Sequence, residues 1–156
     1  MEDLRKELEE AKAKIAEIEK KLAQEESGFW KPETGEMYWF VMDEGKVAWN
    51  NYSNSHNTRY LMGNCFKTEE EAKFAREKLK VIAELKKFAE PKKREWDGCN
   101  DHYCIYYYIY EEKIKIDSYT VSKLPIIYFE SKEKAIEAIE AVGEDRIKKY
   151  YLEVEE

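Results

Sequence analysis

The chain has 156 residues, 39% of them charged, and a formal net charge of −7 at pH 7. This length corresponds to about one domain, and a mean hydropathy of −0.83 argues against a membrane-spanning segment. The acidic excess is largest in residues 93–156, which hold 15 acidic and 10 basic residues. An acidic chain is poorly suited to neutralising the phosphates of a nucleic acid, so non-specific nucleic-acid binding is not expected.

Residues 1–27 are expected to form an amphipathic, coiled-coil-like helix. Three consecutive heptads place apolar residues at every a and d position: Leu4, Leu8, Ala11, Ile15, Ile18 and Leu22. In a parallel pair, the flanking positions would match Glu7 with Lys12, Lys14 with Glu19, and Lys21 with Glu26. Two interpretations remain open. The helix joins copies of the chain in a homo-oligomer, whose order the seam does not fix, or it folds onto its own domain.

Residues 28–92 show the pattern of a first βββα unit. Turn residues separate three aromatic and polar runs, which predict strands at about 37–43, 46–51 and 59–65. Thr68 and Glu71 then form a capping box, which predicts a helix to about Ala89, before Pro91. This helix carries two apolar stripes. One contains Ala72, Leu79 and Ile82, and the other begins at Phe74 and ends at Phe88. We therefore expect the helix to be covered on two sides.

Residues 93–156 repeat this plan after a polar linker from Pro91 to Asp101. Strands are expected at 102–110, 113–118 and 124–129, followed by a helix over 132–142 and a last helical segment over 144–152. Ser131 is the expected N-cap and Gly143 the expected C-terminal glycine. At a spacing of 63 residues, Phe66, Thr68, Ala72, Ala75 and Leu79 correspond to Phe129, Ser131, Ala135, Ala138 and Val142. The predicted fold is therefore α+β, with an N-terminal helix and two βββα repeats.

The candidate chemistry is sparse. Cys99, His102 and Cys104 lie within six residues, with Cys65 as a conceivable fourth ligand, but the spacing matches no zinc motif. Ordinary strand and loop roles are favoured, and no phosphate-binding or nucleophile motif is found. We expect a non-enzymatic protein without metal or cofactor. The odd number of cysteines, with no signal peptide, predicts reduced thiols and a cytoplasmic location.

Aromatic residues on the predicted strands are the better candidates for function. Alternation over 102–110 places Cys104, Tyr106, Tyr108 and Tyr110 on one face, while Ile105 and its neighbours face the helix. Exposed tyrosine and tryptophan are enriched at binding hot spots, and the polar loop 49–59 adds hydrogen-bonding groups. The candidate partner-binding residues are Trp39, Trp49, His56, Arg59, Tyr106, Tyr108 and Tyr110. The alternatives are that the chain buries this face itself and that the loop is only solvated.

Three segments resemble a family of small, uncharacterised proteins common in phages and prophages of low-GC Gram-positive bacteria. They are Trp30–Tyr38, the run from Gly63 to Phe88, and the closing run from Ile127 to Tyr151. The resemblance covers about residues 29–154, and many members also carry an N-terminal coiled-coil-like helix. The resemblance implies a small, dispensable phage gene, and it assigns no catalytic residues to this chain. Such genes often encode proteins that bind and disable host defences, as anti-CRISPR proteins do.

The expected function is thus that of a phage accessory protein that inhibits a host immune factor by protein–protein binding. Two alternatives are a small nucleic-acid-binding module of the AP2 type and a binder of a signalling nucleotide. The first is weakened because residues 36–66 hold only Lys46 and Arg59 as basic residues. The second would use tryptophan or tyrosine to stack the base and Arg59 to contact a phosphate.

Overall fold

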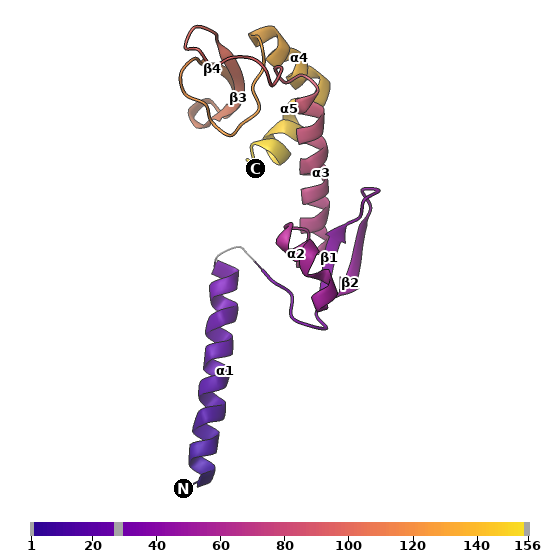
Figure 1. The fold of residues 1–156 in the computed structure, drawn as a ribbon, viewed down its shortest axis with the longest axis vertical. Helices are drawn as coiled ribbons and strands as arrows, with labels where there is room; N and C mark the ends of the chain where they lie inside the picture. Colours follow the sequence, from indigo (N-terminus) through magenta and orange to yellow (C-terminus); the bar gives the residue numbers. More distant parts are fainter. Residues whose placement is uncertain (1, 27–29, 155–156) are drawn as a thin grey trace. The chain divides into compact units, whose positions relative to one another are not determined.

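A computed structural model of the chain describes residues 2–26 and 30–154 (Figure 1). It is mixed α+β, as predicted, with an N-terminal helix and two antiparallel hairpins in the described residues. The chain divides into two compact units, Met1–Lys73 and Phe74–Glu156. No helix among the described residues is both long and apolar enough to cross a membrane.

The predicted N-terminal helix is confirmed as α1 (Glu2–Glu26). Four of its heptad side chains, Leu8, Ile15, Ile18 and Leu22, are 53–57% exposed. Ala11 is exposed as well, whereas the side chain of Leu4 and the predicted helix end at Ser27 lie outside the described residues. Ion pairs within the helix join Lys12 to Glu9 and Lys21 to Glu17, each at 3.0 Å. The described part of the apolar stripe is therefore exposed, and both its packing on a second copy and its packing on its own domain stay predictions.

The first hairpin pairs β1 (Met37–Val41) with β2 (Val47–Asn51) and places Trp39 opposite Trp49. Successive strand residues point to opposite faces, so Tyr38 and Phe40 face a small aromatic core that also contains Tyr52. A short 3₁₀ turn, η1 (Asn54–His56), and the helix α2 (Asn57–Leu61) follow β2 along the chain.

The predicted third strand of this unit, at 59–65, is wrong. Its first residues belong to α2, and only Phe66 forms a bridge, to Trp39. The amide side chain of Asn64 explains the loss of the remaining pairing. Its Oδ1 accepts from the Val41 N–H and its Nδ2 donates to the Val41 C=O, both at 2.8 Å. The side chain thereby hydrogen-bonds the Val41 N–H and C=O, which the backbone of a third strand would otherwise have paired with.

The helix α3 (Glu69–Lys86) begins at the predicted capping box. The Glu71 N–H donates to the Thr68 hydroxyl at 3.2 Å, and the Glu71 carboxylate accepts from the Thr68 N–H at 3.4 Å. Val81 and Leu85 are fully buried in the core of the second unit. The compact units divide within α3, at residue 73, and the predicted boundary at residue 92 stays a prediction. Leu79 is 62% exposed, so the first apolar stripe is not covered along its whole length.

The second hairpin pairs β3 (His102–Tyr108) with β4 (Lys113–Tyr119). The helix α4 (Lys132–Val142) begins at Ser131, whose hydroxyl accepts from the Lys134 N–H, and ends at Gly143 with a φ of +96°. Two short helical segments, α5 (Glu144–Arg146) and the π-helical η3 (Ile147–Tyr151), complete the unit. Its core consists of Val81, Leu85, Ile105, Phe129, Ala135, Ala138, Val142 and Ile147.

The third strand predicted here, at 124–129, is also wrong. Phe129 bridges Tyr103 through two backbone hydrogen bonds of 3.0 and 2.7 Å, and the pairing extends no further among the described residues. Pro125 has no N–H to donate, and the Ile127 N–H donates to the Tyr151 hydroxyl at 3.2 Å. Each unit thus holds a two-stranded hairpin with one additional bridge, and the internal duplication stays a prediction.

Candidate functional site

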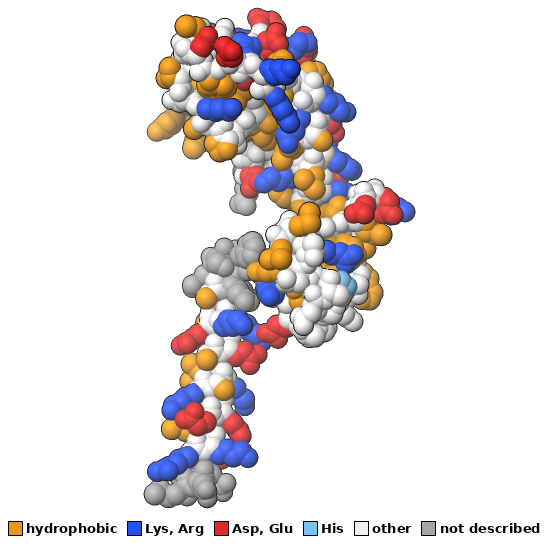
Figure 2. Space-filling view, viewed as in Figure 1, with side chains coloured by type: hydrophobic (Ala, Val, Ile, Leu, Met, Phe, Trp, Pro, Cys, Tyr) orange, Lys and Arg blue, Asp and Glu red, His pale blue; other side chains and the backbone are white. Residues whose placement is uncertain are grey.

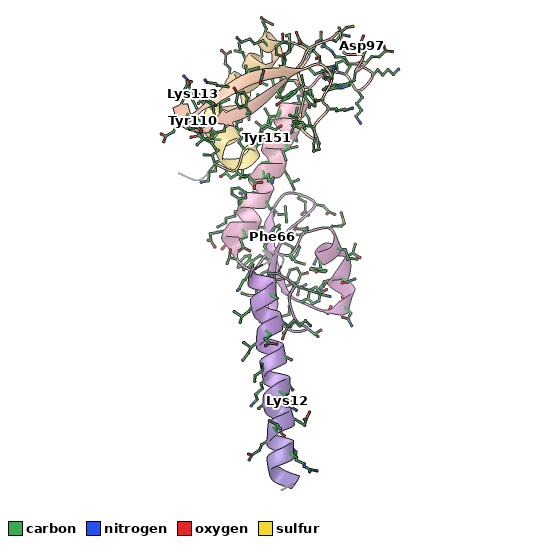
Figure 3. All side chains as sticks on the ribbon, turned by 90° about the vertical axis from the view of Figure 1, so that its left-hand side faces the viewer. Lys12, Phe66, Asp97, Tyr110, Lys113 and Tyr151 are labelled. Atoms are coloured by element: carbon green, nitrogen blue, oxygen red, sulfur yellow. The ribbon has the colours of Figure 1, made fainter. Side chains whose placement is uncertain are left out.

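The predicted tyrosine face is open only at one end of the β3–β4 hairpin. Tyr106 and Tyr108 are half-buried, and Tyr110 is 89% exposed. The strand predicted over 102–110 ends at Tyr108, so Tyr110 lies beyond β3, on the 3₁₀ turn η2 (Ile109–Glu111). We call Tyr106, Tyr108 and Tyr110 the tyrosine cluster. Figure 3 shows Tyr110 and Lys113 together at this end of the hairpin, with Asp97 at the other.

Charged groups hold the tyrosine cluster in place. The Tyr108 and Tyr110 rings are 5.7 Å apart in an edge-on arrangement, and the Lys115 ammonium lies 4.0 Å from the centre of the Tyr108 ring. The Glu111 carboxylate accepts from both Lys113 and Lys115, at 2.6 and 2.5 Å. These two hydrogen bonds lower the pKa of Glu111. The hairpin end therefore presents aromatic rings beside paired charges.

The other end of this face is buried, which corrects the prediction of a continuous open surface. His102 has no exposed surface, and Cys104 is 3% exposed. The segment predicted as a polar linker covers His102. The Trp96 ring stacks on His102 with ring centres 3.6 Å apart and planes 6° from parallel. Tyr128 meets Trp96 edge-on at 4.9 Å.

His102 is the centre of a buried polar arrangement in the second unit. Its Nδ1 lies 2.8 Å from each carboxylate oxygen of Glu90, while its Nε2 has no hydrogen-bond partner among the described residues. Arg94 fixes the covering segment by donating to the backbone oxygens of Glu130 and Asp101, at 2.8 and 2.9 Å. Sequence reasoning missed Glu90 and Trp96. The sequence signal for Trp96 is that it is a single tryptophan within a run of charged and polar residues.

The residues predicted in the first unit divide into two groups. His56 and Arg59 belong to the fold. The Arg59 guanidinium donates to the Tyr38 hydroxyl at 2.8 Å and lies 3.9 Å from the centre of the Phe40 ring. The His56 Nδ1 accepts from the Ser53 N–H at 3.3 Å. Because Arg59 is engaged in these contacts, the structure does not support its predicted role toward a phosphate.

Trp39 and Trp49 remain candidates for binding. They are directly opposite each other across β1 and β2, so their side chains share a face. Trp39 is half-buried and Trp49 is 57% exposed. Met37, on the same face, is 49% exposed. This face of the first hairpin offers a second apolar surface of the kind found at protein interfaces.

The cysteines are dispersed. Cys65 belongs to the first unit, Cys99 is exposed and Cys104 is buried, and burial raises the pKa of the Cys65 and Cys104 thiols. Within residues 2–26 and 30–154, no three histidine, cysteine or acidic side chains gather in a way that could hold a metal ion. The AP2-type alternative calls for a three-stranded sheet, and each sheet in the described chain has two strands.

Comparison with protein-family models, with curated proteins and with solved structures found no match for this chain.

Proposed function

We propose that the chain is a non-enzymatic accessory protein of a phage that inhibits a host immune factor, in the manner of anti-CRISPR proteins, by protein–protein binding. The phage context comes from the sequence resemblance. The observation that carries the binding role is the tyrosine cluster, where Tyr110 is 89% exposed and its neighbour Ile109 is 75% exposed. Large side chains exposed at the end of a rigid hairpin supply contact area at a low cost in entropy.

The acidic excess of residues 93–156 favours a basic surface on the target. Immune factors that act on nucleic acids carry such surfaces, because they must bind phosphates. An acidic partner approaching a basic channel is attracted over a distance of about one Debye length, ~8 Å at physiological salt. The tyrosine cluster would then supply the specific contacts.

Self-association through α1 is the second part of the proposal. The exposed stripe of Leu8, Ile15, Ile18 and Leu22 fits a second copy of the same helix, and the flanking charges are complementary in a parallel arrangement. Figure 2 shows basic and acidic side chains along the described part of this helix, beside its apolar residues. An oligomer would present several tyrosine clusters at once and raise the avidity for the target.

The test is the plating efficiency of a phage on a bacterial host with an active CRISPR system, with and without expression of the chain. Expression should raise the plating efficiency, and Tyr110→Ala should remove most of this gain, since truncating a hot-spot side chain weakens binding by at least about 2 kcal/mol. Val121→Ala, which removes a side chain of similar exposure (82%) outside the cluster, should leave the gain unchanged.

Two results would count against the proposal. If the chain protects the phage from none of the defence systems tested, inhibition of a host immune factor is wrong. If Tyr110→Ala protects as well as the unaltered chain, the inhibition stands but the tyrosine cluster is not its surface. Thermal unfolding of Tyr110→Ala should match that of the unaltered chain, because the side chain is almost fully exposed.

A further inference from the structure

A pocket of about 570 Å³ lies in the second unit, next to the hairpin end that carries the tyrosine cluster. Its volume is within the range of small-molecule and side-chain binding pockets, ~300–1,000 Å³. Phe74 of α3 and Tyr107 of β3 supply its aromatic wall. Tyr107 lies on the opposite face of β3 from Tyr106 and Tyr108, so the pocket and these two residues of the cluster flank one strand.

The C-terminal segment shapes this pocket through an unusual helical turn. The Leu152 N–H donates to the Ile147 C=O at 2.9 Å, which is the i to i+5 bond of the π-helix η3. Such turns are rare and frequently occur at functional sites. Tyr150, on the same turn, packs on Phe74 with ring centres 5.2 Å apart. The aromatic wall is thereby anchored to the segment that carries the pocket's charges.

Three carboxylates and two ammonium groups line the pocket: Glu112, Asp145, Glu153, Lys148 and Lys149. Two of these charges are already neutralised, since Lys78 pairs with Glu153 and Glu144 pairs with Lys148 at 3.2 Å. Within the described part of the chain, Glu112 and Asp145 have no ion pair and are exposed. Lys149 lies 5.6 Å from the centre of the Tyr150 ring. Two carboxylates and one ammonium group therefore remain, an excess of one negative charge.

We propose that this pocket receives an arginine side chain of the partner protein. A guanidinium is planar and can stack on Phe74 or Tyr107 while it donates hydrogen bonds to Glu112 or Asp145. A lysine ammonium would gain the charge interaction but not the stacking, and a nucleotide phosphate would face the two carboxylates. The inference rests on the proposed function only in that the arginine belongs to a protein; the pocket's preference for a guanidinium is tested without any partner.

The experiment measures binding of a hexa-arginine peptide to the full chain by titration calorimetry, with hexa-lysine and ATP as comparison probes. Hexa-arginine should bind several-fold more tightly than hexa-lysine, and ATP should not bind. The double variant Glu112→Gln, Asp145→Asn should weaken hexa-arginine binding by about tenfold or more, since charged hydrogen bonds are lost. Lys149→Gln should strengthen it, because it removes the one opposing charge.

The matched control is Glu133→Gln with Glu140→Gln, which removes two exposed carboxylates of α4 outside the pocket. It should change hexa-arginine binding by less than about twofold, as expected for exposed charges screened by salt. Equal weakening in both double variants, equal binding of the two peptides, or ATP binding that Lys149→Gln abolishes would each overturn the inference. Phage protection that persists after such a failure would leave the proposed function standing. Arginine binding without phage protection would support the pocket's preference for a guanidinium and count against the proposed inhibition.

Discussion

Burial of His102 depends largely on residues of one segment, 90–96, together with Tyr128. Glu90 meets its Nδ1 and Trp96 covers its ring, while Arg94 holds the backbone of that segment to the rest of the second unit. Burial of an imidazole nitrogen costs free energy unless the nitrogen is hydrogen-bonded. Here one nitrogen is bonded and the other faces the interior without a partner among the described residues. The stacked tryptophan is therefore the main barrier between this ring and water.

Trp96→Ala should consequently destabilise the second unit by about 2–4 kcal/mol, slightly below the usual cost of removing a fully buried tryptophan, because the Trp96 side chain is half-buried. The measurement is the free energy of unfolding from urea titration. Glu95→Ala, at the adjacent exposed position, serves as the control and should change the value by less than about 0.5 kcal/mol. Similar losses for the two variants would show that Trp96 does not shield His102.

The longer helices and their caps could be predicted at the scale of single elements, whereas α2 and the third strand of each unit could not. The capping box of Thr68 and Glu71 and the cap at Ser131 are set by residues three positions apart, so a sequence pattern contains all that they require. A strand instead depends on a distant partner. The Asn64 side chain hydrogen-bonds the backbone of Val41, and the Tyr151 hydroxyl accepts from the Ile127 N–H. The two residues of each pair are 23 and 24 positions apart in the sequence.

The candidate site shows the same distinction. Alternation along β3 correctly placed Tyr106 and Tyr108 on one face, because it is a local property of the strand. The contacts of Arg59 with Tyr38 and Phe40, and those of Trp96 with His102, join residues that the linear pattern keeps apart. Arg59 was therefore expected to be free for a ligand, and the segment around Trp96 was expected to be solvated.

The α1 helix leads to a prediction about assembly. Light scattering should give the full chain a mass of at least two copies, and Ile15→Asp should reduce it to one, because a buried charge in the heptad seam is costly. Lys14→Asp, at a flanking exposed position, turns both Lys14–Glu19 pairs of a two-stranded assembly into like-charge pairs and should weaken association mainly at low salt. A monomeric mass for the unaltered chain at micromolar concentration would contradict self-association through α1.

At the scale of the whole molecule, the two units contain separate hydrophobic cores. The first core is small and aromatic and is built around Tyr38, Phe40 and Tyr52, whereas the second gathers aliphatic residues from α3, β3 and α4. Aliphatic burial of this kind contributes ~25 cal/mol for each Å² of apolar surface removed from water. The second unit is therefore expected to be the more stable of the two. The helix α3 contributes residues to both units.

Leu85→Ala tests this separation, because Leu85 is fully buried in the second core, towards the end of α3 and far along the chain from the first hairpin. The substitution should cost about 2–5 kcal/mol of stability, the range for removing a buried leucine side chain. Native-state hydrogen exchange should then show faster exchange of the β3, β4 and α4 amides, with the β1 and β2 amides unchanged. Phe40→Ala, in the first core, should give the reverse pattern. If either substitution accelerated exchange equally in both hairpins, the two units would unfold as one cooperative body.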